Sequence, residues 1–404
     1  MSNYLNTLQE AVDILSNGTH SWMERLFSKG PTAELKNLSS MNVWNGWMTW
    51  QADYRPADTG YLTGRLWLLY ILTGEDDFKN WAIQLIKGMS SDLIRYPQLS
   101  HVSGVDTYYG PAWGYDITGE EAFKTLSLKS AQNQIDSIFS EKTNVFYLSH
   151  GRNVVNIDCT AFLLDQPWAG RYDNKFMDYF KKHNDEILNL RMVRKEGNYF
   201  QVAYFDSNEE FDYLTTHQGW RVDSTWARGQ SWGMHNFCAA FESTGNENYL
   251  NAAIKMCDWW VSHSPSDYIP FYDFEDPEAF KRPKDSCAAA MAATALMRIS
   301  RYVPEKSNSY QPIIEGILTE LTENYLSIGG QLLHGSWGNT VGRWSRELRF
   351  PQEDIVAYGN YYFVESIFRQ LVPDWSLFEL NPKNTKMNPQ IAQDMISNQM
   401  DHQK

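Results

Sequence analysis

The sequence predicts an all-α fold, a closed toroid of helical hairpins, from three observations. Helical periodicity dominates the chain, a short phrase recurs between helical segments, and the spacing of that phrase suits a two-helix unit. The phrase is Thr-Gly, then polar residues, then an aromatic residue, and it occupies residues 73–78, 118–123 and 244–249. Hairpins of this kind cannot bury their apolar faces alone, so they must stack or close into a ring.

Each copy of the phrase is expected to end one helix and to begin the next. Glycine readily takes the left-handed conformation that stops a helix, and acidic residues favour the start of the following helix because they complement its dipole. An apolar or aromatic segment precedes each copy, and an amphipathic segment such as residues 78–86 follows. The repeated unit is therefore predicted to be one buried helix and one half-exposed helix.

Further pairs are predicted over residues 285–302 with 311–325, and a last helix over 358–370. Roughly 45 residues separate the first two phrases, and six or seven such pairs would fill about 370 residues, which favours a closed ring over an open solenoid. Residues 197–205 and 331–335 are expected to form small strands or loops.

The domain organisation follows from the polarity of the end of the chain. The sequence turns polar after about residue 381, and no stretch before it has the composition of an interdomain linker. We therefore expect a single barrel domain over residues 1–380 and a polar tail over 381–404.

Composition and charge exclude several classes of protein. The chain has 35 Lys and Arg against 49 Asp and Glu, a net charge of −14, and no basic stripe that would neutralise the phosphates of a nucleic acid. No apolar run approaches the roughly 20 residues that span a bilayer, and the first basic residue, Arg25, comes too late for a signal peptide. We expect a cytoplasmic protein with no nucleic-acid or membrane partner, and nothing in the sequence indicates a protein partner or an oligomeric state.

The four cysteines are Cys159, Cys238, Cys257 and Cys287. They are widely spaced, lie in apolar helical segments and form no CxxC pair or Cys/His ligand spacing. Buried free thiols in a reducing compartment are therefore expected, rather than a disulfide framework or a structural zinc site.

The first segment with residues suited to chemistry is 153–164, where Asp158 heads an apolar helix between Ile157 and Cys159. A carboxylate in that position is partly desolvated, which raises its pKa and suits it to general acid catalysis. An aspartate at the head of a helix can equally be an ordinary cap. The pattern alone leaves both interpretations open.

The second segment, 215–233, concentrates His, Gln, Arg and Trp in a loop that runs into a helix. Arg228 and Trp232 are four residues apart and share a helix face. A guanidinium beside an indole can hold a sugar carboxylate, since arginine offers two parallel donors. The alternative is a surface salt bridge beside a core tryptophan.

Two further segments point to the same end of the predicted ring. In residues 282–290, Asp285 or Ser286 is a good N-cap for an alanine-rich helix, and a purely structural helix is the alternative. Residues 100–113 place His101 and Asp106 near the start of another inner helix, where Asp106 can also be a simple cap. An opening lined by Trp and Tyr would suit sugar rings, although most aromatic residues must serve packing.

At these residues the chain resembles the unsaturated glucuronyl hydrolases, glycoside hydrolase family 88. The resemblance is strongest over residues 216–219, 224–232 and 283–286, with support from 64–70 and 358–363. It implies an (α/α)6 barrel with a substrate pocket at one mouth and neither a metal nor an organic cofactor.

Members of that family act on the 4,5-unsaturated uronic acid that lyases leave at a non-reducing end, and the reaction begins as hydration of a vinyl ether. The resemblance gives Asp158 the place of the acid and base that protonates C4 and helps water attack C5. It places the unsaturated sugar against His217, Gln218, Arg228 and Trp232.

The chain also departs from the family pattern. The family has His-Asp before the glycine where this chain reads His101-Val102-Ser103-Gly104, so Asp106, one helical turn further on, is the candidate replacement for the missing carboxylate. Gln201 stands where the family commonly has a histidine, and Tyr61-Leu62 replaces a frequent Phe-Trp pair. The expected substrate contacts also include His101, Gln201 and Ser286.

The expected partner is an oligosaccharide with a terminal uronic acid, and the first hypothesis is its hydrolysis by vinyl-ether hydration. The second is hydrolysis of a saturated uronide, for which Asp158 and Asp106 would have to form a carboxylate pair about 5 to 10 Å apart. The third is a sugar-binding protein that has lost catalysis, and an epimerase on a related toroid is a weaker possibility.

Overall fold

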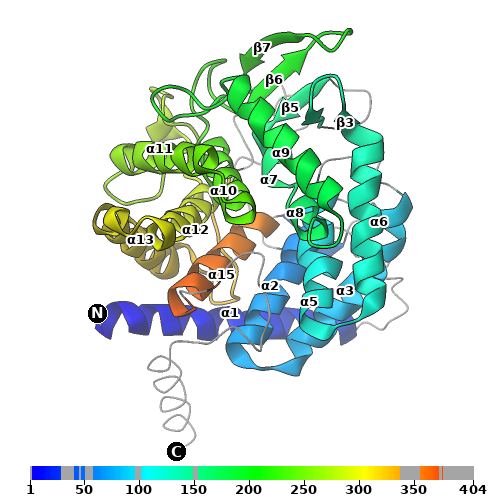
Figure 1. Ribbon diagram of the computed structural model, residues 1–404. Helices are drawn as coiled ribbons and strands as arrows, with labels where there is room; N and C mark the ends of the chain where they lie inside the picture. Colours follow the sequence, from blue (N-terminus) through cyan, green and yellow to red (C-terminus); the bar gives the residue numbers. More distant parts are fainter. Residues whose placement is uncertain are drawn as a thin grey trace, which may run out of the picture.

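The computed structural model describes residues 2–28, 41–44, 47–50, 58–95, 102–148, 153–336, 355–372 and 375. Over these residues the helices alternate along the chain between an outer and an inner position (Figure 1). The result is an (α/α)6 barrel, as the periodicity and the resemblance predicted. The predicted polar tail over 381–404 lies outside the described residues.

Six inner segments form the wall of the barrel. They are α2 (Asp58–Thr73), α4 (Ser103–Thr107) continued by α5 (Trp113–Thr118), α7 (Ile157–Ala161) with α8 (Asp165–Ala169), α10 (Ala227–Thr244), α12 (Ser286–Tyr302) and α15 (Ala357–Leu371). Each contacts the next, and α15 returns to contact α2, so the ring is closed.

Six outer helices cover this wall. They are α1 (Ser2–Ser28), α3 (Asp76–Arg95), α6 (Glu121–Ile138), α9 (Asn174–Asn189), α11 (Glu247–His263) and α13 (Ser307–Glu320). Figure 1 shows α1 running across one end of the view, beneath α2 and α15. It contacts both α3 and α13, so the outer layer closes where the inner one does.

The recurring Thr-Gly phrase ends a helix at all three of its occurrences, as predicted. The three glycines have positive φ angles of 75°, 73° and 68°, and each donates its N–H to the carbonyl four residues earlier. The threonine hydroxyl donates to a carbonyl of the same helix and accepts the N–H two residues ahead. The residues concerned are Thr73-Gly74, Thr118-Gly119 and Thr244-Gly245.

The later helices also agree with the periodicity. The segment predicted over 285–302 is α12, and the one predicted over 358–370 is α15. The predicted helix over 311–325 is α13 followed by the π-helical turn η6 (Leu321–Tyr325). The 3₁₀ turns η4 (Ala279–Lys281) and η5 (Pro304–Lys306) connect neighbouring elements.

In the part of the chain that the structure describes, the strands form three small antiparallel sheets. Two are pairs, β1 (Met41–Trp44) with β2 (Trp47–Trp50) and β3 (Phe139–Ser140) with β4 (Val145–Phe146). The third sheet joins β5 (Val154–Asn156), β6 (Val202–Phe205) and β7 (Phe211–Thr215). The stretch predicted over 197–205 thus contains a strand, whereas the stretch over 331–335 contributes only isolated bridges.

One inner segment is kinked. Between α4 and α5 the chain forms the π-helical turn η3 (Tyr108–Ala112), which contains Pro111 and a non-helical backbone at Gly110. Proline removes a helix hydrogen bond, and π-turns inside helices recur at functional sites. The kink turns Tyr108 and Tyr109 into the core, where both are fully buried.

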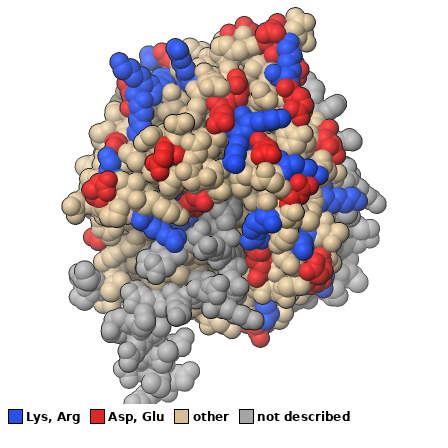
Figure 2. Space-filling model, viewed as in Figure 1, with Lys and Arg blue, Asp and Glu red and all other residues tan. Residues whose placement is uncertain are grey.

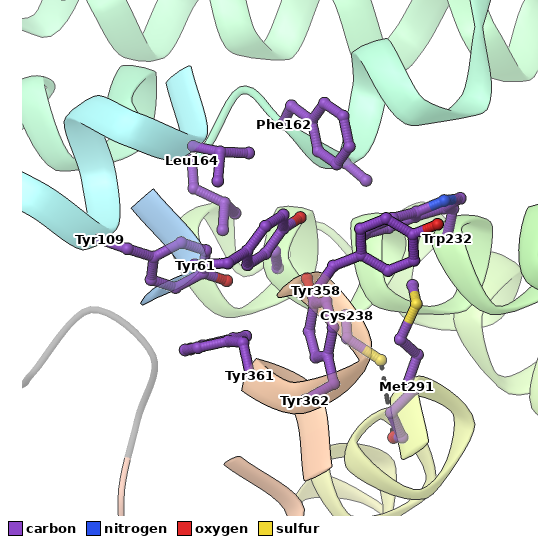
Figure 3. Packing of buried hydrophobic residues seen from close by; sticks show 14 of the residues in the cluster. Tyr61, Tyr109, Phe162, Leu164, Trp232, Cys238, Met291, Tyr358, Tyr361 and Tyr362 are labelled. Carbon is purple, nitrogen blue, oxygen red and sulfur yellow. Dashed lines mark hydrogen bonds between the residues drawn. The ribbon is translucent and has the colours of Figure 1, made fainter. Parts of the chain in front are cut away.

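Tyrosines from three inner segments, α2, η3 and α15, meet in the buried core (Figure 3). Tyr61 of α2 lies between Tyr109 and Tyr358, with ring centroids 5.6 and 6.0 Å away. Tyr361 and Tyr362 of α15 lie 5.5 and 5.8 Å from the same ring. The inner helices are therefore joined through aromatic contacts.

The surface agrees with the acidic composition. Figure 2 shows basic and acidic side chains interspersed over this face, and the described residues there form no continuous basic band. In the part of the chain that the structure describes, no helix is both long and apolar enough to cross a membrane.

Candidate active site

Asp158 lies in the first turn of α7, directly after strand β5. The start of α7 is anchored to the neighbouring strand, because the N–H of Ile157 donates to the Gln201 carbonyl at 2.9 Å. The Asp158 side chain is only partly exposed, and its Oδ1 is buried without a hydrogen-bond partner among the described residues.

Burial raises the pKa of Asp158 to about 7, while the nearby Arg228 guanidinium and a backbone N–H oppose the rise. A carboxyl with this pKa is about half protonated at neutral pH, which suits proton transfer in both directions. The desolvation that the sequence predicted for this position is therefore present.

Arg228, in the first turn of α10, is 2% exposed and bonded within the protein. Its Nη1 donates to Asp285 Oδ2 at 2.9 Å and to the carbonyl of Ser336. Its guanidinium stands over the rings of Trp226 and Tyr358, 4.6 and 5.1 Å from their centroids. The sequence analysis expected this guanidinium beside the Trp232 indole. The aromatic rings that it contacts in the described structure are those of Trp226 and Tyr358.

Asp285 is the N-cap of α12, one of the two residues predicted for that role. Its Oδ1 accepts the N–H groups of Cys287 and Ala288 at 3.2 and 3.3 Å, while Oδ2 holds Arg228. The Ser286 hydroxyl donates to the Leu333 carbonyl at 2.7 Å. Ser286 is fixed beside the ion pair, and its contact with substrate stays a prediction.

Gln201 organises the loop that carries two other predicted site residues. Its Oε1 accepts the hydroxyl of Thr216 and the N–H groups of His217 and Gln218, at 2.7, 2.7 and 2.9 Å. Its Nε2 donates to Gln218 Oε1 at 2.6 Å. Since the Gln201 carbonyl also holds α7, one residue links the His217–Gln218 loop to the start of the Asp158 helix.

Asp106 is fully buried in α4, and its Oδ1 accepts the N–H of Gly60 at 2.6 Å. A Cβ on Gly60 would lie 2.6 Å from the Asp106 Cα, so only glycine allows this approach of α2 and α4. Val102, where the resemblance places a carboxylate, is half-buried at the N-cap of α4. His101 lies outside the described residues.

Trp232 on α10 is only 2% exposed and lies in the aromatic core of the barrel, as the alternative of a core tryptophan had it. Its ring packs against Phe162, Tyr358 and Tyr362, with centroids 4.9, 5.8 and 5.7 Å away (Figure 3). Tyr61 stands on the other side of Phe162, 6.3 Å from that ring. Burial, the neighbouring Tyr109 and the Asp158 carboxylate all raise the pKa of Tyr61, which places this tyrosine within the electrostatic reach of Asp158.

The structure brings some of the predicted site residues close together and links others only indirectly. Arg228 and Trp232 both contact the Tyr358 ring, and Asp158 lies within the electrostatic reach of Arg228. Gln201 ties the His217–Gln218 loop to the start of the Asp158 helix. Asp106 is connected through Gly60, which precedes Tyr61 in α2.

Sequence reasoning missed three residues at this site: the arginine partner Asp285 and the tyrosines Tyr61 and Tyr358. Asp285 was read only as a cap, because a cap and an ion-pair partner look the same in a sequence. Tyr358 had a usable signal, since it opens one of the segments that carry the resemblance. In the described part of the chain, no three His, Cys, Asp or Glu side chains gather as a metal site would require.

The sequence is similar to those of named hydrolases. No family model matches the chain. It is 25% identical over 339 residues to the unsaturated chondroitin disaccharide hydrolase of Streptococcus pneumoniae, covering 79% of this chain and 82% of that protein. It is 26% identical over 328 residues to the unsaturated glucuronyl hydrolase of Bacillus sp. strain GL1, covering 77% and 85%.

Solved structures extend the likeness to the fold. The crystal structure of unsaturated glucuronyl hydrolase from Bacillus sp. GL1 matches with a TM-score of 0.78 and 22% identity, over 90% of this chain and 96% of that one. The enzyme of the same name from Streptococcus agalactiae matches with a TM-score of 0.79 and 21% identity, over 93% and 94%.

Proposed function

We propose that this chain, a divergent relative of the unsaturated glucuronyl hydrolases, is a glycoside hydrolase that releases a 4,5-unsaturated uronic acid from the non-reducing end of lyase-generated oligosaccharides. Relatives at 25 and 26% identity carry the names of such enzymes. One solved relative is a complex with dGlcA-GalNAc6S, and another is a complex with dGlcA-Glc-Rha-Glc.

The observation that carries the proposal is the state of Asp158. A vinyl ether is attacked by adding a proton to carbon, which needs an acid that is protonated near neutral pH and is not solvated by bulk water. Asp158 has a pKa of about 7 and one oxygen that is buried and unbonded in the described structure.

The reaction follows from the chemistry of the double bond. The Asp158 carboxyl gives its proton to C4, and the resulting carboxylate takes a proton from the water that adds to C5. The C5 hemiketal opens by breaking its bond to the ring oxygen, which leaves a ketone at C5 and a hemiacetal at C1. The hemiacetal expels the rest of the oligosaccharide as an alcohol, so one water is consumed in each turnover.

The other site residues have supporting roles in this proposal. Arg228 is a positioning residue, because its guanidinium is bonded to Asp285 and fixes the Tyr358 ring beside Trp232. The sugar is expected to contact the partly exposed His217 and Gln218, and also His101. Trp232, Gln201 and Ser286 are at most 2% exposed in the described structure, so in this proposal they support the sugar contacts from behind. Asp106 supplies the second carboxylate, one turn along α4 from Val102.

The ring of hairpins acts as one catalytic domain over residues 1–380, with the polar tail outside it. We further infer a cytoplasmic, reducing location. It is supported by Cys238, Cys257 and Cys287, which are all buried free thiols.

The test is the ultraviolet absorbance of the conjugated double bond. Unsaturated disaccharides from hyaluronan, chondroitin, heparin, gellan, ulvan and xanthan lyase digests are incubated with the wild type and with Asp158→Asn. The absorbance is expected to fall with the wild type and to fall at least about 100-fold more slowly with the variant. Asp165→Asn is a matched control, since Asp165 is an aspartate on the following helix α8 whose Oδ1, like that of Asp158, is buried without a hydrogen-bond partner among the described residues. It is expected to leave the rate unchanged, because the mechanism does not use Asp165.

Two outcomes would contradict the proposal. Release of a saturated uronate without an absorbance change would show a conventional uronide hydrolase. Binding of these sugars with no turnover of any of them would show a sugar-binding protein.

A further inference from the structure

The three-stranded sheet carries a pair of stacked tyrosines next to the candidate site. The rings of Tyr204 on β6 and Tyr213 on β7 are 4.8 Å apart and nearly parallel, with an interplanar angle of 17°. The Tyr204 hydroxyl lies 2.7 Å from Nε2 of His217, one of the proposed sugar contacts. Tyr213 is 47% exposed, so one face of this pair is open to a ligand.

The register of the sheet shows that this pair continues outward from the active-site end. Asn156, Val202 and Thr215 stand opposite one another in the three strands, at the end where β5 leads into α7. Tyr204 and Tyr213 are two residues further along, which places them on the same face and about 7 Å from that end. On this face the side chains pass from buried at Val202 to exposed at Tyr213.

The negative charge around the β6–β7 hairpin disfavours anionic ligands. The turn between β6 and β7 carries Asp206, Glu209 and Glu210, and Asp212 follows in β7, so four acidic residues lie within seven. Lys142 reaches this turn and is bound to Glu210 and to the Asn208 carbonyl. A sulfated or carboxylated sugar would be repelled here, whereas the apolar face of an uncharged pyranose can stack on an exposed tyrosine.

We propose that Tyr204 and Tyr213 form an outer subsite for an uncharged pyranose in the leaving part of the substrate. The subsite rests on the proposed function for the identity of the reacting sugar. It predicts a preference for unsulfated unsaturated oligosaccharides longer than a disaccharide, such as dGlcA-Glc-Rha-Glc.

The test compares the full-length chain with Tyr213→Ala on dGlcA-Glc-Rha-Glc and on the disaccharide dGlcA-Glc. The wild type is expected to have the higher kcat/KM on the tetrasaccharide. Tyr213→Ala is expected to lower that value about tenfold, mainly through KM, as loss of one aromatic contact implies. Activity on the disaccharide is expected to change less than about twofold, because the disaccharide does not reach Tyr213.

The chain offers a matched control in Phe211, which has the same 47% exposure on the same strand. The register shift after Tyr204 pairs Phe211 with Phe205, so its ring lies on the opposite face of the sheet. Phe211→Ala is expected to leave both substrates unaffected. The subsite is wrong if Phe211→Ala lowers tetrasaccharide turnover as much as Tyr213→Ala does, or if Tyr213→Ala lowers turnover of both substrates equally.

Binding separates this inference from the proposed function. If the wild type turns over neither these two sugars nor any of the other lyase products, the proposed function fails, and the subsite is still decided by calorimetric titration of dGlcA-Glc-Rha-Glc. An affinity about tenfold weaker for Tyr213→Ala than for Phe211→Ala supports the subsite. Equal affinities of the two variants, or no binding to the wild type, overturn it.

Discussion

At the scale of single residues, the central feature is the Asp158 carboxyl group, whose pKa is shifted by two opposing effects. Burial favours the protonated form of Asp158, while the Arg228 guanidinium favours the charged form. The desolvation could be predicted, because Asp158 is flanked by apolar residues at the head of a helix. The ion pair that holds Arg228 could not be predicted, because its partner Asp285 is 57 residues further along the chain and only the folded barrel brings the two together.

The pH profile of the reaction tests this balance. The proton donor is the neutral form of Asp158, whose pKa is about 7, so kcat/KM on an unsaturated disaccharide is expected to be level at acid pH and to fall about tenfold per pH unit above about pH 7. Steady-state rates between about pH 5 and pH 9 measure this. A profile without an inflection between about pH 6 and pH 8 would contradict the assigned pKa.

At the scale of elements, local signals were predictable where they repeat within a few residues. The hydrogen bonds of the Thr-Gly phrase join residues that are at most four apart in the sequence. Its three helix ends were therefore correctly predicted. The kink at η3 and the strands β5 and β7 were not predicted, whereas β6 lies in the stretch 197–205 that was expected to form small strands or loops. Strands of three to five residues leave little periodicity, and β5 pairs with a strand nearly fifty residues away.

The junction of α4, α6 and α8 holds a second aspartate that the mechanism does not use. Asp165 is fully buried, and burial raises its pKa to about 8 against the opposing effect of nearby backbone N–H groups and Gln166. Its Oδ1 has no hydrogen-bond partner among the described residues, and a Cβ on Gly104 would lie 2.8 Å from it. The neutral acid is therefore the form that this junction accommodates.

Asp165→Asn is expected to remove part of the pH dependence of stability. The folded protein keeps a proton that the unfolded chain releases above its ordinary pKa of 3.8, so the free energy of unfolding falls as pH rises from about 4 to about 8. Urea unfolding at about pH 5 and pH 8 should show a fall several kcal/mol larger in the wild type than in the variant. Asp158 contributes equally to the pH dependence of both proteins. Equal falls in the free energy of unfolding of the wild type and the variant would therefore contradict a neutral Asp165.

At the scale of the whole molecule, ring closure depends on contacts between the two ends of the described chain. Arg65 of α2 donates to Asn360 of α15 at 3.1 Å, to Thr19 of α1 at 2.6 Å and to the Gly330 carbonyl at 2.5 Å. A closed ring was predictable from the number of hairpins that the chain can hold. The residue that joins its ends was not, because a buried arginine bonded to neutral acceptors has no sequence pattern.

Arg65→Met is expected to lower the free energy of unfolding by about 2 to 4 kcal/mol, because it leaves several buried acceptors unbonded. Arg301→Met, at an exposed position on α12, is expected to change it by less than about 0.5 kcal/mol. Urea unfolding followed by circular dichroism and by tryptophan fluorescence measures both. Equal stability of the two variants would show that Arg65 does not hold the ring together.

The most direct measurement of the central claim follows the proton that Asp158 gives to carbon. Hydrolysis of an unsaturated disaccharide in D₂O is stopped early, and the released sugar is examined by NMR. We expect loss of the double bond and one deuterium at C4 in a single configuration, with at least about 100-fold less product from Asp158→Asn in the same time. Release of a sugar that keeps its double bond and carries no deuterium at C4 would contradict this expectation.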